Sequence, residues 1–427
     1  MKNRALLSAI GASLFLSVQG QAMATNGYFS HGYGPVSKSL AGACVAMTNS
    51  AMCSAHNPAT LISVGNRWEV GAALFAPKRG FAANDDFQTP PYASIPAGNY
   101  ESGNDYFLIP HFAYARQLDA DTAIGLIVGG QGGMNTEYDS AVFQNFNSPG
   151  NVASSPVGMD LIQMFAGLNF AKRLSPQHSV AIMPVLAVQR LKVQGLEPFR
   201  PFSSNPDQVT NNGSSWSRGG GVRVGWLWQP DERLAIGASY QSKLWMTAFD
   251  EYKGLLAEGG DFDIPPMFDL GFAYKFVPKW TLAFDYQRIQ NEQVASLGNA
   301  ADLAFVPGDI LLGTNDGLGF GWKDIDVYKL GLQWEYRPDL TFRAGFGYTS
   351  DTFEGSQALF NILAPAVVKR HFTFGIGKRL DSGKEINLAV MYAPEHRLSG
   401  TNPNTGPQTG HVEMSQWDIE LGATFEF

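Results

Sequence analysis

The chain has 427 residues, a formal net charge of −8, 12% aromatic residues and 47 glycines. This acidic balance argues against a nucleic-acid partner. Beyond the amino-terminal region, no segment approaches the ~18 consecutive apolar residues that a membrane-spanning helix needs, which excludes a helical membrane protein. Two or three soluble domains, or one large β-structure, remain.

Residues 1–24 have the layout of a secretory signal peptide. Lys2 and Arg4 give a positive start, an apolar run follows, and the segment ends on the small-x-small cleavage pattern AMA. A first transmembrane helix is the alternative, but the apolar run is short and a polar segment follows it. We therefore predict an exported protein whose mature chain begins at Thr25 and is more acidic than the precursor.

Residues 25–66 are rich in Gly, Ser, Ala and Asn and show no strand periodicity. Such a segment is either a flexible tail or a plug packed inside the structure that follows. Small residues and aromatics without charge runs favour packing, so we predict a plug. The segment contains the two cysteines of the chain, Cys44 and Cys53. In an exported protein we expect them to form a disulfide, the alternative being two buried free thiols.

Four glycines interrupt a predicted strand in the stretch AIGLIVGGQGGMNTEY. They are Gly129, Gly130, Gly132 and Gly133. Glycine weakens a strand interior because it adds backbone entropy and has no side chain to pack. The pattern therefore indicates a bulge, a bend or a close approach of another piece of backbone.

Strict alternation of apolar and polar residues marks the strands of the later chain. In the final residues, WDIELGATFEF, Trp417, Ile419 and Leu421 share an apolar face that ends on Phe427. This length suits the ~10 residues with which a barrel strand crosses a bilayer. Strands of soluble proteins are usually shorter, about 5–6 residues. The same alternation recurs over residues 222–229, 268–276, 281–287, 328–336 and 340–348.

The connections between strands alternate between short and long. Six tight turns fall at residues 118–121, 174–178, 229–232, 277–279, 337–339 and 380–385. Seven long stretches lie around them, at about 77–105, 139–157, 196–216, 249–265, 290–322, 350–367 and 396–411. Short periplasmic turns and long extracellular loops are typical of outer-membrane barrels. A soluble sandwich or propeller would not need an apolar face on every strand.

These patterns predict an all-β fold, a fourteen-stranded antiparallel transmembrane β-barrel over residues 67–427, with residues 25–66 as an amino-terminal hatch in its lumen. The localisation expected is the outer membrane of a Gram-negative bacterium. Outer-membrane lipid and lipopolysaccharide would then surround the barrel, which we expect to be a monomer.

Three of the long loops are more apolar than those of a polar porin. They cover residues 252–267, 301–313 and 357–369 and carry Leu, Ile, Phe and Val. Exposed apolar patches tend to mark binding surfaces for hydrophobic ligands. The loops therefore either capture such ligands or pack on one another to cap the barrel, and the sequence favours neither reading.

Motifs for catalysis are absent or weak. The seven histidines show no metal-ligand spacing, and no Gly-rich phosphate loop is followed by a lysine. We therefore predict no enzymatic activity, no metal and no cofactor. A surface Ser/His or Asp/His pair, as in outer-membrane lipases and proteases, is the enzymatic alternative, and hydrolysis of phospholipid or peptide would reveal it.

The chain resembles the FadL/TodX family of outer-membrane transporters for long-chain fatty acids and other hydrophobic compounds. The resemblance rests on Asn57-Pro58-Ala59 and on residues 109–118, 123–139 and 322–351, in that order and spacing. It implies a fourteen-stranded barrel with an amino-terminal hatch. It also implies an inward kink in the third strand that opens the barrel wall, at the position of the glycine run. The alternative for the glycines is that they only make room for the backbone of the plug.

The resemblance also implies roles for individual residues. Arg190 and Lys323 match basic residues that hold a ligand carboxylate in a lumenal pocket, where a carboxylate needs a cationic partner. Pairing of these cations with lumenal acids is the alternative, and the candidate acids are Asp324, Asp285 and Glu335.

Two further matches concern the plug. Tyr28 and Phe29 match the amino-terminal region that lies near the ligand pocket. Asn57, Pro58 and Ala59 match the hatch motif that meets the kink, although an ordinary Asn-Pro turn also accounts for them.

The function expected is passive uptake of a hydrophobic small molecule, with long-chain fatty acids first. The molecule would adsorb on the loops, wait in a lumenal pocket and leave sideways through the kinked strand. Aromatic hydrocarbons are the alternative ligands. A porin-like channel for polar solutes and a structural or adhesion barrel are the alternatives from other classes.

Overall fold

The structure is a computed structural model that describes residues 26–86, 93–306, 308–380 and 383–427. The predicted signal peptide and its cleavage site lie outside the described residues. Within the described ranges, no helix has both the length and the apolar character needed to cross a membrane.

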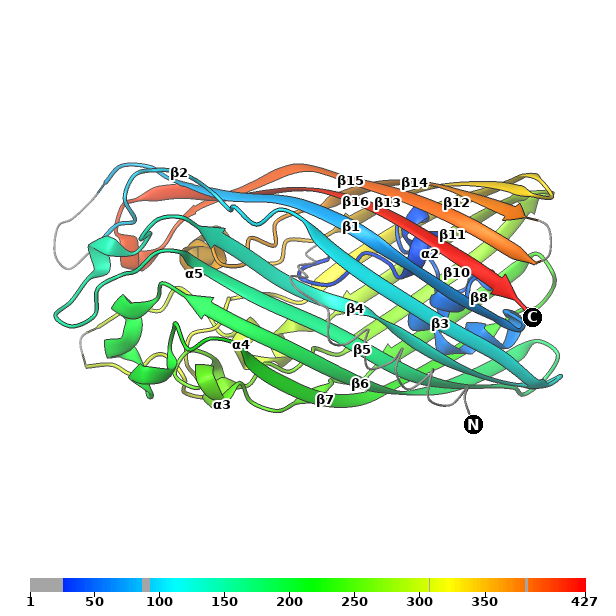
Figure 1. The fold of residues 1–427 in the computed structure, drawn as a ribbon, viewed down its shortest axis with the longest axis horizontal. Helices are drawn as coiled ribbons and strands as arrows, with labels where there is room; N and C mark the ends of the chain where they lie inside the picture. The colour runs from blue at the N-terminus through cyan, green and yellow to red at the C-terminus, as the bar shows by residue number, and fades with distance from the viewer. Residues whose placement is uncertain (1–25, 87–92, 307, 381–382) are drawn as a thin grey trace, which may run out of the picture.

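The strands form one sheet that closes on itself (Figure 1). Each long strand pairs antiparallel with the next, and β16 returns to β1 in a ladder that runs from Arg67↔Glu426 to Ala83↔Gly410. The described residues contain fourteen long strands, which are β1 (Arg67–Ala83), β3 (Phe107–Asp119), β4 (Thr122–Tyr138), β5 (Val157–Arg173), β6 (His178–Gln194), β7 (Ser215–Trp228), β8 (Leu234–Gln241), β10 (Met267–Val277), β11 (Trp280–Ile289), β12 (Ile325–Arg337), β13 (Leu340–Thr349), β14 (Arg370–Leu380), β15 (Lys384–Thr401) and β16 (Thr409–Glu426). Two short strands, β2 (Gly98–Glu101) and β9 (Trp245–Met246), add to β1 and β7. The predicted fourteen-stranded antiparallel barrel is confirmed.

The two faces of the strands differ as the period-2 pattern predicts. On β16, Leu421 is 57% exposed, whereas the neighbouring Glu420 is 2% exposed. An apolar outer face and a polar inner face are what a strand needs when lipid surrounds the barrel. Aromatic pairs lie near the short turns, where Trp280 stacks on Trp334 and Trp68 on Phe425. Such rings suit the membrane interface.

The helices are short. Three precede the barrel: α2 (Gly34–Ser39), η1 (Ala51–Ala55) and η2 (Pro58–Ser63). The others lie in the long loops: η3 (Gln144–Phe146), η4 (Glu197–Phe202), η5 (Pro206–Gln208), η6 (Asp250–Tyr252), α3 (Ala257–Gly260), η7 (Asn291–Gln293), α4 (Ala295–Gly298), η8 (Gly355–Gln357), α5 (Ala358–Asn361) and η9 (Pro403–Thr405). In Figure 1, α2 lies within the barrel outline, and α3, α4 and α5 gather at the end with the long loops.

The hatch, residues 26–66, is buried inside the barrel and bonded to its wall. Lys38 on α2 pairs with Asp418 at 2.7 Å and Glu420 at 3.1 Å on β16, and both carboxylates are buried. Glu420 also lies 2.6 Å from Nδ1 of His111 on β3. A buried cation is tolerable when carboxylates neutralise it in this way. These contacts account for charges on the inner faces of lipid-exposed strands.

The backbone of the hatch is held by acids of the wall and by a cross-link. Asp285 on β11 accepts hydrogen bonds from the backbone N–H groups of Cys44 and Val45, at 2.6 and 2.9 Å. Cys44 and Cys53 form a disulfide, with their Cα atoms 5.3 Å apart and both side chains buried. The cross-link shortens the free loop of the hatch and so reduces the conformational entropy of its unfolded state.

Candidate functional site: a break in the wall and three apolar pockets

The ladder between β3 and β4 is incomplete. β4 pairs with β5 along its whole length, but its pairing with β3 ends at His111↔Gly129. Among the described residues, Phe107–Pro110 of β3 and Gly130–Tyr138 of β4 therefore face each other without ladder pairs. We call this the break. The β4–β5 register also shifts between Gly130 and Gly132, which marks a bulge.

The amino-terminal segment, residues 26–30, occupies the break. Phe29 forms an isolated antiparallel bridge with Gly132. Ser30 N–H donates to the carbonyl of Gln131 at 3.1 Å, and Gly133 N–H donates to the carbonyl of Tyr28 at 3.0 Å. The bulged strand β4 thus receives a backbone partner from the hatch at the break.

The glycines of the run differ in what they require. A Cβ on Gly132 would lie 2.5 Å from the carbonyl oxygen of Tyr28, closer than real Cβ atoms approach. A Cβ on Gly129 would meet the Phe165 ring at 3.6 Å, an ordinary contact. Close approach of the Tyr28 backbone therefore accounts for Gly132. Because this approach occurs at the break, the glycine both makes room for the hatch and lies where the wall is interrupted.

A buried arginine bridges the break above the amino-terminal segment. Arg79 of β1 donates from Nη1 to the carbonyl of Asn135 on β4 and from Nη2 to the carbonyl of Asn104, just before β3. Further along, Gly103 N–H donates to the carbonyl of Glu137 at 2.9 Å. Residues 102–106 therefore cover the far end of the break, near Glu137.

The three apolar loops meet in one cavity, which we call the outer pocket. It is narrow, with about 30 Å³ of free space. Leu255 and Leu256 come from the first loop, Leu312 from the second, and Phe360 and Leu363 from the third. The loops therefore pack on one another, and in doing so they line a narrow apolar pocket.

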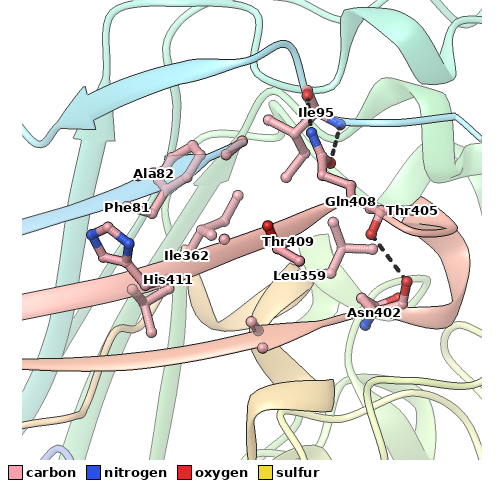
Figure 2. Close-up of a pocket in the computed structure, with 15 residues that line it drawn as sticks. Phe81, Ala82, Ile95, Leu359, Ile362, Asn402, Thr405, Gln408, Thr409 and His411 are labelled. Atoms are coloured by element: carbon pink, nitrogen blue, oxygen red, sulfur yellow. Dashed lines mark hydrogen bonds between the residues drawn. The ribbon is translucent and has the colours of Figure 1, made fainter. Parts of the chain in front are cut away.

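A second cavity, the side pocket, has about 40 Å³ of free space between the ends of β1, β15 and β16 and helix α5 (Figure 2). Phe81, Ile95 and Leu359 supply apolar wall. Its polar groups are already paired, since Gln408 accepts from Ile95 N–H at 2.9 Å and donates to the Ile95 carbonyl at 2.6 Å. The side pocket therefore offers apolar contact and few hydrogen bonds.

The third cavity, the inner pocket, lies beside the break and is small, with about 10 Å³ of free space. Its lining comprises Tyr28, Arg79, Met134, Asn135, Trp322, Met414 and residues 364–366. Trp322 is fully buried, and its ring centroid lies 5.7 Å from that of Tyr28. Asn361 accepts a hydrogen bond from the Trp322 indole at 2.6 Å and so fixes the ring.

One stretch of chain, residues 358–366, separates the three pockets. We call it the partition. Leu359 and Ile362 line the side pocket, and Phe360 and Leu363 line the outer pocket. Its last three residues line the inner pocket. The partition is tied to β4, because the Tyr138 hydroxyl donates to the carbonyl of Ile362 at 2.9 Å and the Thr136 hydroxyl to that of Leu363 at 2.8 Å. A movement of β4 would therefore reach all three pockets.

The two basic residues expected in the lumen lie elsewhere. Arg190 shares the outer face of β6 with Leu186, which is 67% exposed, and it pairs with Asp160 of the neighbouring β5. The residue of β6 that faces inward at this height is Gln189, whose side chain donates to the carbonyl of Phe262. The expectation of a lumenal Arg190 is therefore corrected.

Lys323 lies in an extracellular loop before β12, half exposed and paired with Glu354. The hydrogen bond to Glu354 raises the pKa of Lys323 above its usual value. Its neighbour Trp322, and not Lys323, enters the inner pocket. The acids named as alternative partners do not pair with either residue: Asp324 pairs with Arg288, and Asp285 binds the hatch backbone.

The Asn57-Pro58-Ala59 motif does not meet the break. Asn57 caps η2 by accepting from Ala59 N–H at 3.1 Å, and its amide donates to the carbonyls of Val45 and Trp226. The motif packs on Gly225 of β7 and Gly237 of β8, where a Cβ would collide with the Asn57 side chain. It anchors the hatch to β7 and β8 and, through the Pro58 carbonyl, to Asn169 of β5, whereas residues 28–30 meet the break.

Tyr28 lines the inner pocket and Phe29 pairs with β4 at the break, and their role in ligand binding stays a prediction. Arg79 and Trp322 are the pocket residues that the sequence did not point to. Arg79 follows Lys78 near the end of β1, in a stretch that the sequence assigns to a long loop. Among the described residues, no group of three or more potential ligands is arranged to hold a metal ion.

Comparisons with known proteins agree with this architecture. Residues 16–427 match the family model described as outer membrane protein transport protein (OMPP1/FadL/TodX). The Pseudomonas putida toluene transporter TodX superposes with a TM-score of 0.66 at 21% identity, over 94% of this chain and 100% of that one. For the Ralstonia pickettii toluene transporter TbuX the TM-score is 0.64 at 18% identity, over 93% and 99%. For a Pseudomonas aeruginosa FadL homologue it is 0.67 at 14% identity, over 94% and 100%.

A sequence comparison with curated proteins gave no significant match. The family model nevertheless spans nearly the whole chain, and the solved relatives share its fold throughout. The chain therefore belongs to the FadL/TodX family of outer-membrane proteins that transport hydrophobic compounds, and its place is the outer membrane of a Gram-negative bacterium.

Proposed function

We propose that the protein carries hydrophobic molecules passively from the outer pocket to the inner pocket and releases them sideways through the break. The observation that carries the proposal is the double role of Tyr28, which lines the inner pocket and also pairs with the kinked strand. Displacement of the amino-terminal segment would thus empty the pocket and open the wall together. No energy source is needed for such a step, because an apolar ligand gains free energy on entering lipid.

Long-chain fatty acids are the ligands we propose first. The inner pocket has room for about one water molecule in this structure, so either an acyl chain or a ring would enter only when the amino-terminal segment or the partition moves aside. Aromatic hydrocarbons are the second candidate, supported by the likeness to the toluene transporters TodX and TbuX. Uptake of labelled oleate and labelled toluene by cells that express the protein compares the two directly.

A porin-like channel for polar solutes is less well supported, because the hatch lies within the barrel and is bonded to the wall through Lys38 and Asp285. The protein should accordingly conduct ions poorly in a planar bilayer. A steady, large conductance would favour the porin alternative. No chemical step is proposed, so purified protein should not hydrolyse phospholipid or peptide.

The sideways exit is tested by blocking the outer mouth of the break. Leu108 lies on β3 beside the break and is 63% exposed, and Leu186 on β6 is equally exposed but distant from it in the sheet. Leu108→Cys and Leu186→Cys would each be labelled with a bulky maleimide; the native cysteines are buried in a disulfide. Labelling at 108 should abolish oleate uptake, and labelling at 186 should leave it unchanged. Normal uptake through the labelled Leu108→Cys protein would refute the lateral exit.

The surroundings of the barrel also remain proposals. We propose a monomer whose upper outer surface contacts lipopolysaccharide. Outward-facing charges such as Arg190 and Arg397 lie beyond the apolar band of their strands, at the height where charged head groups would begin. Sedimentation in detergent and co-purification of lipopolysaccharide would test the two statements.

A further inference from the structure

A polar cavity lies at the end of the barrel opposite the apolar pockets. We call it the vestibule; it has about 500 Å³ of free space, far more than any of the three apolar pockets. Its rim comes from the short turns and the strand ends beside them, with Lys279 after β10, Arg337 at the end of β12 and Arg379 on β14. Short turns of outer-membrane barrels face the periplasm, so the vestibule opens on that side.

We propose that the vestibule binds a small soluble phosphate compound and that Arg343 holds the phosphate group. The lining contains five cationic side chains, the three of the rim together with Arg67 and Arg343, against three acidic ones. A cleft with an excess of one charge attracts ligands of the opposite charge. The same lining is unsuited to a hydrophobic molecule, so this inference is independent of the proposed transport route.

Arg343 has an unpaired charge. It lies on the inner face of β13 and is 5% exposed. Its Nε donates to Gln333 and its Nη1 to Asn387, both at 2.9 Å, and both acceptors are neutral amides. In the described part of the chain no carboxylate lies at hydrogen-bond distance from it, since Glu385 is 3.9 Å from Nη2. A buried guanidinium without a hydrogen-bonded anion is unfavourable, so the side chain is suited to receive one.

The geometry around Arg343 favours a phosphate. Gln333 and Asn387 are buried and fix the plane of the guanidinium, while Nη2 has no hydrogen bond to the described residues. A phosphate has several acceptor oxygens and forms charge-assisted hydrogen bonds with guanidinium groups. The exposed cations of the rim, such as Lys279, would add attraction at longer range. The ligand would come from the periplasm, because the lining lies on the inner face and the turns and not on the lipid-facing side.

The site also includes the hatch. Asn49 lines the vestibule, its side chain donates to Gln333 at 2.8 Å, and its carbonyl accepts from Arg67 at 3.2 Å. Gln333 therefore accepts hydrogen bonds from both Asn49 and Arg343. A phosphate bound to Arg343 would restrain this connection, so occupation of the vestibule should stabilise the periplasmic end of the hatch.

Binding is tested on the whole barrel with its hatch, in phosphatidylcholine nanodiscs at low ionic strength, by isothermal titration calorimetry. The probes are inorganic phosphate and glycerol 3-phosphate, and glycerol is the neutral control. Both phosphates should bind and glycerol should not. Tighter binding of glycerol 3-phosphate would assign the vestibule to organic phosphates, and equal or tighter binding of inorganic phosphate would assign it to the free anion. Added salt should weaken either interaction.

Three variants locate the bound phosphate. Arg343→Met should weaken binding by about thirtyfold, the effect of losing a charge-assisted hydrogen bond. Lys279→Met, on an exposed turn, should weaken it by roughly threefold through the lost long-range attraction. Arg116→Met is the matched control, because Arg116 is an exposed arginine at the same end of the barrel, on β3 and outside the vestibule, and binding should be unchanged.

A second measurement reports the effect on the hatch. Phosphate should slow amide exchange at Ala51, whose N–H donates to Glu69 on the strand that carries Arg67. It should also raise the midpoint temperature of thermal unfolding in the wild type and in Lys279→Met, but not in Arg343→Met, because only a ligand bound to the folded state stabilises it.

The absence of binding by both phosphates would overturn the inference and leave the transport proposal untouched. Wild-type affinity in Arg343→Met would overturn the assigned site, since the rim would then attract anions without Arg343. If Arg343→Met does not fold, the two exposed variants decide: weaker binding in Lys279→Met alone supports the vestibule, and equal binding in Lys279→Met and Arg116→Met contradicts it.

Discussion

Gly132→Ala should detach the amino-terminal segment from β4. The added Cβ would stand 2.5 Å from the Tyr28 carbonyl oxygen and 2.9 Å from its ring, so the segment must shift. Two backbone hydrogen bonds depend on the present position, from Ser30 to Gln131 and from Gly133 to Tyr28. At ~1 kcal/mol each, their loss amounts to about 2 kcal/mol, or roughly thirtyfold in the opening equilibrium.

Hydrogen exchange at the amides of Ser30 and Gly133 measures this opening. Both should exchange about thirtyfold faster in Gly132→Ala than in the wild type. Gly129→Ala is the matched control, since its Cβ makes an ordinary contact at 3.6 Å and exchange should be unchanged. Equal protection in the two variants would show that the segment does not need the bare backbone of Gly132, and the reasoning about the run would be wrong.

Three further changes test the hatch and the loops. Lys38→Met should lower the free energy of unfolding by about 3–5 kcal/mol, because it strands two buried carboxylates on β16, whereas Lys369→Met, at a partly exposed pair, should cost less than about 1 kcal/mol in thermal unfolding. Cys53→Ser should lower the free energy of unfolding of the hatch by about 2–3 kcal/mol. Amide hydrogen exchange should then be faster around residues 44–56 while the barrel strands keep their protection. Burial raises the pKa of Asp261 from 3.8 to about 6, so the folded loop holds a proton that the unfolded chain releases between these values. Stability should therefore fall as pH rises from 4 through 6, by about 1–2 kcal/mol after allowance for partial exposure. In thermal unfolding, Asp261→Asn should make this slope shallower without removing it, because burial also raises the pKa of the neighbouring Asp263.

The strand pattern could be read from the sequence because lipid imposes it. A residue such as Leu421 must face hydrocarbon and Glu420 must not, so the two-residue period survives whatever lies in the lumen. The six short turns were predictable because a tight reversal uses few residues and these are of turn-forming types such as Gly, Pro, Asn and Asp.

The placement of site residues was less predictable. The sequence places Arg190 on the same face of β6 as Leu186, which is correct, but this face points outward. A charge does not identify the inner face here, because the part of a strand that rises above the bilayer can carry charges on both faces. Lys323 was assigned by extending the alternation of β12 backward, whereas the strand begins at Ile325 and the preceding residues form a loop. The alternation of inward and outward side chains holds only for residues that are paired within the sheet.

The pocket residues Arg79 and Trp322 depend on contacts that no local pattern encodes. The position of Arg79 depends on hydrogen bonds to the carbonyls of residues 104 and 135, and that of Trp322 on a hydrogen bond to the side-chain amide of Asn361. Such contacts arise from how distant loops fold over the barrel end.

The hatch precedes β1 in the chain, yet Lys38 finds its partner on β16, 380 residues later. The lysine charge is therefore compensated only once the last strand has arrived and closed the wall against β1. A chain that stopped short of β16 would leave an uncompensated cation among apolar side chains, and the hatch would have no stable seat. The ion pair thus couples the packing of the hatch to the presence of the last strand. The hatch is stable in the lumen only when β16 has completed the barrel.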